Sequence, residues 1–131
     1  MMGRNSARGI IRPLEERDEA AANAVIRAVR REFGVTGEGF DSHEPELPRL
    51  HARYRKPRSA YYVVDLDGCI EGGGGIAPYG AADSPTCELQ RMDLAPGARR
   101  AGYGRALLLQ CLDAARAHGY GRADGRAPVV P

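Results

Sequence analysis

The sequence predicts an α+β domain in which a mixed, largely antiparallel sheet is flanked by helices. Four segments have the β-branched, aromatic or alternating character of strands, namely residues 10–14, 60–66, 69–77 and 86–94. Two longer segments, residues 19–33 and 102–118, repeat apolar residues at helical spacing. Three strands follow one another between the helices, which is typical of this fold class. A chain of 131 residues has room for one domain with one core.

The chain before residue 58 is expected to contain a strand and two helices. Pro13 marks the strand as an edge strand or as the end of a strand, and Asp18 is placed to cap the helix that follows. That helix has an apolar face made of Ala22, Val25, Ile26, Val29 and Phe33. Gly34 suits its C-terminal end, and a short second helix is expected near residues 46–54.

Residues 60–66 and 69–77 are expected to form a hairpin. Asp67-Gly68 lies between them and suits a type I′ turn, whose two central residues both need positive φ. The second strand contains four consecutive glycines, residues 72–75. Neither Gly-Lys-Ser/Thr nor a helix follows these glycines, so a phosphate-binding loop is not favoured. We expect a thin, bulged strand against which another group packs closely.

The loop between residues 94 and 103 carries the clearest chemical signal. It contains the pattern Arg-x-x-Gly-x-Gly from Arg99 to Gly104 and leads directly into an apolar helix. The first amide groups of a helix have no partner within the helix, and the helix dipole adds partial positive charge there, so the site favours a phosphate. Gly102 and Gly104 let a ligand approach the backbone, while Arg99, Arg100 and Arg105 add cationic donors.

The strand, Pro96, the Arg99-x-x-Gly102-x-Gly104 loop and the helix together resemble the acyl-CoA-binding motif of the GNAT (GCN5-related) N-acetyltransferase family. The resemblance extends over residues 10–120, and its specific part is residues 86–109. It implies the GNAT fold, acetyl-CoA as acyl donor, and an amine of a small molecule or peptide as acceptor. A dinucleotide-binding loop is less favoured, because Leu107 stands where Gly-x-Gly-x-x-Gly needs its third glycine.

The resemblance also implies roles for individual residues. In the family, loop amides hold the pyrophosphate of CoA, which here assigns that role to Gly102 and Gly104 with the amides of Arg100, Ala101, Tyr103 and Arg105. The side chains of Arg99, Arg100 and Arg105 would contact the phosphates, although simple surface charges are the alternative interpretation. The main-chain groups of Met92 and Leu94 would pair with the pantetheine arm. An amine must lose a proton before it attacks, and Glu88 is the first candidate for the base, with Glu71 second. Either carboxylate could equally be a solvent-facing strand residue.

The segment between the first two helices is the variable part of the family and would shape the acceptor pocket. His43, Glu44, Glu46, His51 and Tyr54 could serve there, although an exposed segment with ordinary polar residues is the simpler interpretation. The acceptor itself cannot be read from these residues.

Composition argues against several other functions. The net charge of +2 is not concentrated in a basic run, which disfavours nucleic-acid binding. No apolar stretch is long enough to cross a membrane, so a cytoplasmic location is the default. Three cysteines and three histidines are scattered without metal-ligand spacing. We therefore expect no metal, and we expect Cys69, Cys87 and Cys111 to be small buried residues.

The residues after Tyr120 lose all periodicity, although the resemblance implies a fifth strand, a helix and closing strands there. We therefore expect a single incomplete domain over residues 1–131, truncated at its C-terminus, with residues 1–8 and 121–131 disordered. An unpaired edge on the central strand would then invite a homodimer. The alternative to an active N-acyltransferase is a catalytically inactive remnant, or an interaction module, with a weak CoA site.

Overall fold

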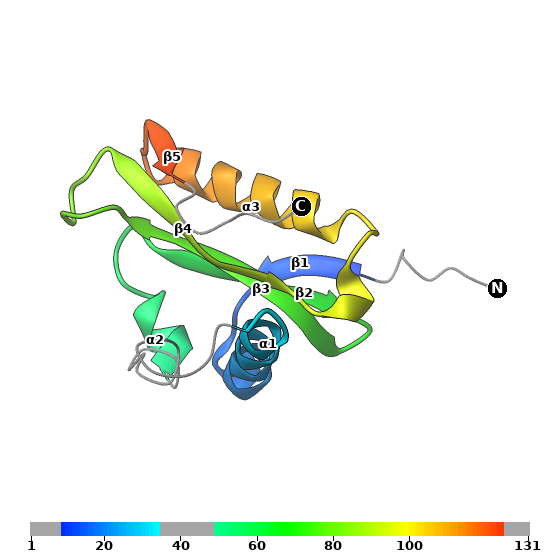
Figure 1. The fold of residues 1–131 in the computed structure, drawn as a ribbon. Coiled ribbons are helices and arrows are strands. Elements are labelled where there is room, and N and C mark those ends of the chain that lie inside the picture. Colours follow the sequence, from blue (N-terminus) through cyan, green and yellow to red (C-terminus); the bar gives the residue numbers. More distant parts are fainter. Residues whose placement is uncertain (1–8, 35–48, 125–131) are drawn as a thin grey trace.

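The computed structural model describes residues 9–34 and 49–124, which form one sheet with helices on both faces (Figure 1). The strands are β1 (Gly9–Pro13), β2 (Ala60–Leu66), β3 (Cys69–Pro78), β4 (Thr86–Leu94) and β5 (Arg122–Asp124). The helices are α1 (Glu19–Glu32), α2 (Leu50–Arg53) and α3 (Tyr103–Ala117), with short 3₁₀ turns η2 (Glu16–Asp18) and η5 (Pro96–Ala98). In Figure 1, α1 and α2 lie on one face of the sheet and α3 on the other.

The sheet has the order β1-β2-β3-β4-β5. The first four strands pair antiparallel with their neighbours, and β5 pairs parallel with β4. The predicted fold class is therefore confirmed. The expected hairpin joins β2 and β3, and both residues of its turn have positive φ, 54° at Asp67 and 91° at Gly68. The side chain of Asp65 accepts a hydrogen bond from the Gly68 amide at 2.7 Å, which fixes the turn.

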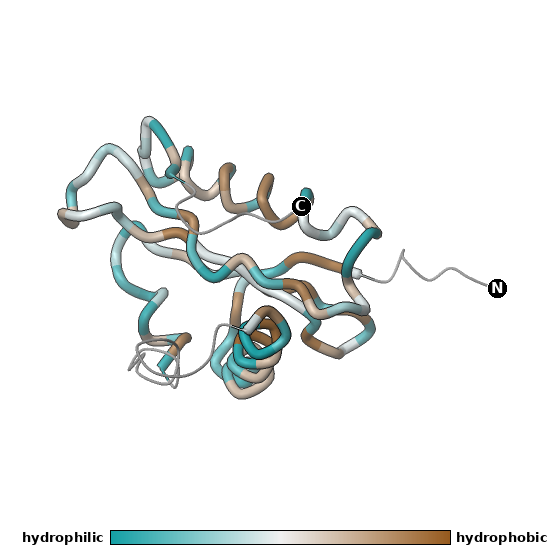
Figure 2. The backbone as a smooth tube through the Cα atoms, viewed as in Figure 1, coloured by the Kyte–Doolittle hydropathy of each residue, from teal (hydrophilic) through white to brown (hydrophobic). Residues whose placement is uncertain are grey.

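Two apolar clusters hold the layers together, one on each face of the sheet. The cluster under α1 and α2 contains Leu14, Ala22, Ile26, Leu50, Tyr54, Tyr61 and Val63. The cluster under α3 contains Ile76, Cys87, Leu89, Cys111, Ala114, Ala115 and Tyr120. Figure 2 shows hydrophobic residues along the strands and on the helices that border them. Burial of these side chains supplies the main driving force for folding.

The glycine run in β3 is the thin, bulged strand that the sequence predicts. The register with β4 shifts between Gly73 and Gly75. A Cβ on Gly73 would lie 2.7 Å from the ring of Tyr61, and a Cβ on Gly74 would overlap the sulfur of Met92. Large side chains from the neighbouring strands therefore occupy both faces of β3 where its own side chains are missing.

The carboxylate of Asp18 does not cap α1 as the sequence suggested. It receives two hydrogen bonds from Arg12, at 2.7 and 3.0 Å, and one from the Glu15 amide at 2.8 Å. The Nε of Arg12 also donates to Asp65 at 3.0 Å. Asp18 is only 4% exposed, and this burial acts to raise the pKa of its carboxyl group. The hydrogen bonds from the Arg12 guanidinium outweigh that effect, so the pKa is lowered. The side chain ties η2 to β1 in place of capping the helix.

The structure also corrects the expectation that residues 121–131 are all disordered. Gly119 ends α3 with φ of 84°, and the buried ring of Tyr120 follows, with its hydroxyl donating to the Arg58 carbonyl at 2.7 Å. The Gly121 amide then donates to the Pro85 carbonyl at 2.8 Å, which starts β5 alongside β4. A strand of three residues is too short to show a period in the sequence. Residues 125–131 lie outside the described part of the chain.

Replacing Gly75 by alanine should destabilise the fold. Its Cβ would lie 2.7 Å from the Ala60 carbonyl oxygen, which is main chain and cannot rotate away. We expect the free energy of unfolding, measured by urea titration, to fall by about 1–3 kcal/mol. Gly121→Ala is the matched control, because the atom nearest to its Cβ is 3.9 Å away. Equal stability of the two variants would contradict close packing on β3.

Candidate functional site

A β-bulge in β4 determines which main-chain groups reach the outer edge of this strand. The Tyr79 amide donates to the Thr86 carbonyl at 2.9 Å, so Thr86 faces β3 and the polar groups of Cys87 and Leu89 face the opposite side. Arg91 has φ of 55°, and two residues of β4 oppose one of β3 there. Before this bulge the main-chain groups of even-numbered residues face β3, and beyond it those of odd-numbered residues do.

After the bulge, Met92 and Leu94 direct their main-chain groups away from β3. The Ala95 amide donates to the Glu71 carbonyl at 2.8 Å, which shows that Ala95 faces β3 and that its neighbour Leu94 does not. Among the described residues, β5 pairs only with residues 86–88 of β4. The outer edge of β4 around Met92 and Leu94 is therefore not covered by β5.

The loop after β4 presents amide groups that no described residue satisfies. The amides of Ala98 and Arg99 are used inside η5, where they donate to Ala95 and Pro96. The chain then passes through positive φ at Arg100 (66°) and Gly102 (87°) before α3 begins. Within the described part of the chain, no acceptor receives a hydrogen bond from the amides of Arg100, Ala101, Gly102, Gly104 or Arg105. These amides lie at the positive end of the α3 dipole, which favours an anion.

The three arginines predicted at this loop differ in their surroundings. Arg100 and Arg105 are exposed. Arg99 is partly buried, and its guanidinium binds Glu32 at the end of α1 through two hydrogen bonds, at 2.8 and 2.6 Å. Its Nε donates to the Leu94 carbonyl at 3.0 Å, so that carbonyl is engaged and the Leu94 amide is the group left at the edge.

The tyrosine between the two motif glycines anchors the start of α3 against the far edge of the sheet. Its ring lies against Gly9 of β1, so closely that a Cβ on Gly9 would overlap the Tyr103 hydroxyl. The other residues predicted in the loop, Ala101 and Gly102, are exposed, and Gly104 is partly exposed in the first turn of α3. The structure thus brings the predicted residues from Met92 to Arg105 together at one end of the sheet.

Glu88, the first candidate for a base, is part of a hydrogen-bonded chain on the β4 face that lies toward α2. Gln90 donates from its amide nitrogen to Glu88 at 2.8 Å. The hydroxyl of Tyr54 donates to the amide oxygen of Gln90 at 2.6 Å. Glu88 is partly buried. Gln90 directly, and Tyr54 through Gln90, orient this carboxylate, and no sequence pattern indicated either hydrogen bond.

Glu71, the second candidate, lies elsewhere. Glu88 is opposite Ala77 in the sheet, six residues along β3 from Glu71, which corresponds to about 20 Å. The Glu71 carboxylate is near the loop, 3.8 Å from where a Cβ on Gly97 would lie. The structure therefore separates the two candidate bases.

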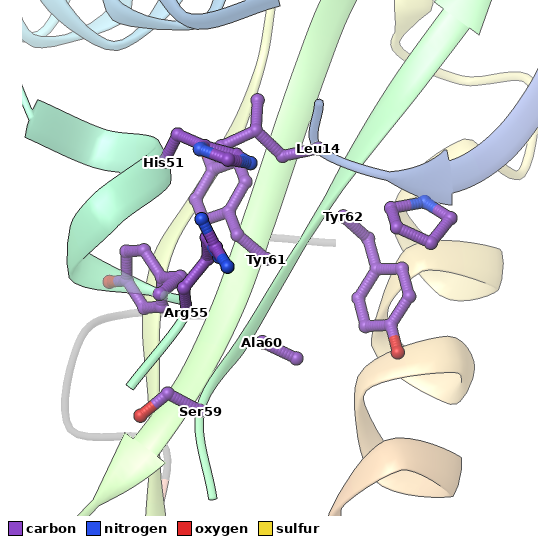
Figure 3. Close-up of a pocket in the computed structure, with 9 residues that line it drawn as sticks. Leu14, His51, Arg55, Ser59, Ala60, Tyr61 and Tyr62 are labelled. Carbon is purple, nitrogen blue, oxygen red and sulfur yellow. The ribbon is translucent and has the colours of Figure 1, made fainter. Parts of the chain in front are cut away.

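A pocket of about 190 Å³ lies between α2 and the strands β1 and β2 (Figure 3). Figure 3 shows His51, Arg55 and Tyr61 on the α2 side of the sheet and Tyr62 on the opposite side. His51 and Tyr54 line this pocket, and the other residues predicted for the acceptor, His43, Glu44 and Glu46, lie outside the described residues. Tyr54 contacts both this pocket and the Glu88 chain.

Asp93 is a titratable residue of β4 that the sequence analysis did not single out. Burial raises the pKa of its carboxyl group to about 6, although Arg30 of α1 and Arg91 act to lower it. Among the described residues, no hydrogen bond or ion pair to this carboxylate is present. The raised pKa of Asp93 results from the packing of α1 over β4, which no pattern of neighbouring residues in the sequence reveals.

The cysteines offer no reactive thiol at this site. Cys87 and Cys111 are buried as predicted, and burial raises the pKa of both thiols, that of Cys111 to about 12. Cys69 is exposed because it follows the hairpin turn, contrary to the prediction. In residues 9–34 and 49–124, no group of His, Cys, Asp and Glu side chains is arranged to hold a metal ion. Over the same ranges, no helix is both long and apolar enough for a membrane crossing.

Comparison with known proteins places the chain among acetyltransferases. The model of the acetyltransferase (GNAT) family matches residues 22–125. A relative in Escherichia coli K12, the uncharacterized N-acetyltransferase YjgM, is 39% identical over 114 residues, which cover 86% of this chain and 68% of the relative.

Solved structures show the same fold at low sequence identity. A GNAT-family acetyltransferase of Staphylococcus aureus Mu50 matches with a TM-score of 0.75 at 16% identity, over 86% of this chain and 69% of its own. A predicted acetyltransferase of Clostridium acetobutylicum, solved with acetyl-CoA, matches with a TM-score of 0.72 at 14% identity, over 91% of this chain and 80% of its own.

The elevated pKa of Asp93 has a testable consequence for stability. A carboxyl group whose pKa is higher in the folded state than in the unfolded state costs stability once it ionises, so this cost is present above about pH 6 and disappears below about pH 4. We expect Asp93→Asn to raise the free energy of unfolding by about 1–3 kcal/mol at pH 7.5. Urea titrations should show this difference vanishing at pH 4; a difference independent of pH would contradict it.

Proposed function

The chain belongs to the acetyltransferase (GNAT) family, and from this premise we propose that it transfers the acetyl group of acetyl-CoA to an amine. The observation that carries the proposal is that the amides of Arg100, Ala101, Gly102, Gly104 and Arg105 have no acceptor among the described residues, next to a stretch of β4 that β5 does not cover. The acetyl-CoA bound to the Clostridium acetobutylicum protein, which shares this fold, supports the choice of donor.

The described residues fit the two chemically different parts of an acyl-CoA molecule. A diphosphate needs several converging N–H donors and positive charge, which the loop amides, the α3 dipole and the exposed Arg100 and Arg105 offer. A pantetheine arm carries amide groups and can pair with an open strand edge in the manner of an added strand. The Leu94 amide and the main-chain groups of Met92 are the donors and acceptors on that edge.

Acid–base chemistry is the second requirement of the reaction. An ammonium group has no lone pair, so the acceptor must lose a proton before its nitrogen attacks the thioester carbon and the carbon–sulfur bond breaks. We assign this proton to Glu88, whose carboxylate is oriented by Gln90 and, through Gln90, by Tyr54. The acceptor would then reach Glu88 from the side of α2.

The stretch of β4 that no described strand covers could also pair with a second copy of the chain. Such pairing and acyl-CoA binding would use the same main-chain groups, so a homodimer formed there would compete with the donor. An inactive protein that keeps only a weak CoA site is the alternative outcome of the experiments below.

Blocking the loop should abolish donor binding without unfolding the protein. Gly104→Val places a branched side chain in the first turn of α3, where the amides of Gly104 and Arg105 have no acceptor among the described residues. We expect the affinity for CoA, measured by calorimetry, to fall at least about 100-fold, because a misplaced diphosphate loses several charge-assisted hydrogen bonds. Circular dichroism should show an unchanged fold. Undiminished affinity in a folded variant would remove the loop from the donor site.

Removing the proposed base should slow catalysis and spare donor binding. For Glu88→Gln we expect kcat to fall about 100- to 1,000-fold in a thiol-release assay over a panel of amines, with the KM for acetyl-CoA unchanged. Tyr54→Phe should cause a smaller loss, because it acts through Gln90. Glu71→Gln is the matched control and should keep its kcat. If Glu88→Gln retains activity, the base is another group, and Asp93→Asn is then the variant to assay.

A further inference from the structure

The guanidinium of Arg99, the first residue of the Arg-x-x-Gly-x-Gly motif, connects three segments of the fold. Both terminal nitrogens bind the carboxylate of Glu32, the last residue of α1, at 2.8 and 2.6 Å. Its Nε binds the carbonyl of Leu94, the last residue of β4, at 3.0 Å. The guanidinium carbon also lies 5.4 Å from the centre of the Phe33 ring. One side chain thus links the end of a helix, the end of a strand and the loop itself.

These contacts use the directions in which an arginine would otherwise hold a phosphate. The pair with Glu32 uses one N–H of each terminal nitrogen at the end-on edge of the guanidinium, and the bond to Leu94 uses the Nε–H of the side-on edge, so neither of these edges keeps two N–H groups for a second bidentate partner. Glu32 also neutralises the charge, and the same contact lowers the pKa of the Glu32 carboxyl group. Arg100 and Arg105, by contrast, are exposed and have no ion pair among the described residues. The cations that face an incoming anion are therefore these two and not Arg99.

The loop needs an external support because its own backbone is strained. Arg100 has φ of 66°, a left-handed conformation that costs a side-chain-bearing residue energy and persists only where the surroundings impose it. Arg99 immediately precedes this residue. The bond from its Nε also holds the Leu94 carbonyl and thereby fixes how the chain leaves β4. The Glu32 carboxylate, 67 residues earlier in the sequence, holds the other end of the same guanidinium.

We propose that Arg99 is a positioning residue, which together with Glu32 braces the loop in its diphosphate-binding shape, and that it does not itself bind the diphosphate. This proposal deepens the proposed function and rests on it, because the braced loop is the donor site. It makes donor affinity depend on the C-terminal end of α1, an element that the motif does not include.

A double-mutant cycle over Arg99→Ala, Glu32→Ala and the double variant tests the brace, with CoA binding measured by calorimetry at several salt concentrations. Removal of either partner breaks the ion pair, so we expect both single variants to weaken CoA binding, Arg99→Ala by about 10-fold and Glu32→Ala by a smaller factor because the bond from Nε to Leu94 remains. The double variant should bind CoA no more weakly than Arg99→Ala. The dependence of affinity on salt should match that of the wild type. Arg100→Ala, which removes an exposed cation, is the control and should make this dependence shallower.

The opposite pattern would overturn the proposal. If Arg99 binds the diphosphate directly, Arg99→Ala loses far more affinity than Glu32→Ala, its salt dependence becomes shallower, and Glu32→Ala leaves affinity unchanged or raises it.

A second readout separates failure of the brace from failure of the proposed function. Without any ligand, ¹⁵N order parameters of residues 97–102 should fall in both Arg99→Ala and Glu32→Ala. Unchanged order parameters would overturn the brace even if CoA binds. A wild-type chain that does not bind CoA, but whose loop loosens in both variants, would refute the proposed function and retain the brace as a purely structural element.

Discussion

The structure depends on a constraint at the junction of β4 and α3, where five amide groups between Arg100 and Arg105 have no acceptor among the described residues. Unsatisfied donors of this kind are tolerated at the surface, where water reaches them, and they become valuable when an anion replaces that water. The loop holds this shape through positive φ at Arg100 and Gly102, through η5, and through the packing of Tyr103 on Gly9. Each of these features would be unnecessary in a simple connection between a strand and a helix.

The irregularities of β3 and β4 also shape the candidate donor site. The bulge at Arg91 reverses the alternation of β4, so that Met92 and Leu94 direct polar main-chain groups toward the uncovered edge while Asp93 lies under α1. The neighbouring glycine run lets the Tyr61 ring and the Met92 side chain pack directly over β3. A regular sheet with ordinary side chains in β3 would have met neither condition. The orientation of Met92 and Leu94 at the outer edge of β4 thus arises from a departure from regularity.

Features of the fold that depend on residues close together in the chain could be predicted from the sequence, whereas contacts between residues far apart in the chain could not. The bounds of β2 and β4 and the hairpin turn at Asp67-Gly68 depend on neighbouring residues, and they were predicted correctly. The partner of Arg99 is 67 positions away, and Tyr54 is 36 positions from Gln90, so only the folded chain brings these pairs together. The raised pKa of Asp93 results from burial under α1. The position of β5 depends on Tyr120, whose hydroxyl bonds to the distant Arg58 carbonyl. For Arg99, the motif predicted a phosphate contact and could not reveal the ion pair with Glu32.

We propose that the amides of Arg100, Ala101, Gly102, Gly104 and Arg105, which have no acceptor among the described residues, bind a diphosphate. This proposal is tested most directly by following the amide resonances of a ¹⁵N-labelled chain while CoA is added, and separately while pantetheine, which has no diphosphate, is added. The account predicts that CoA shifts the resonances of Arg100, Ala101, Gly102 and Gly104 and that pantetheine leaves them in place. Resonances that CoA does not move, or that pantetheine moves equally, would contradict it.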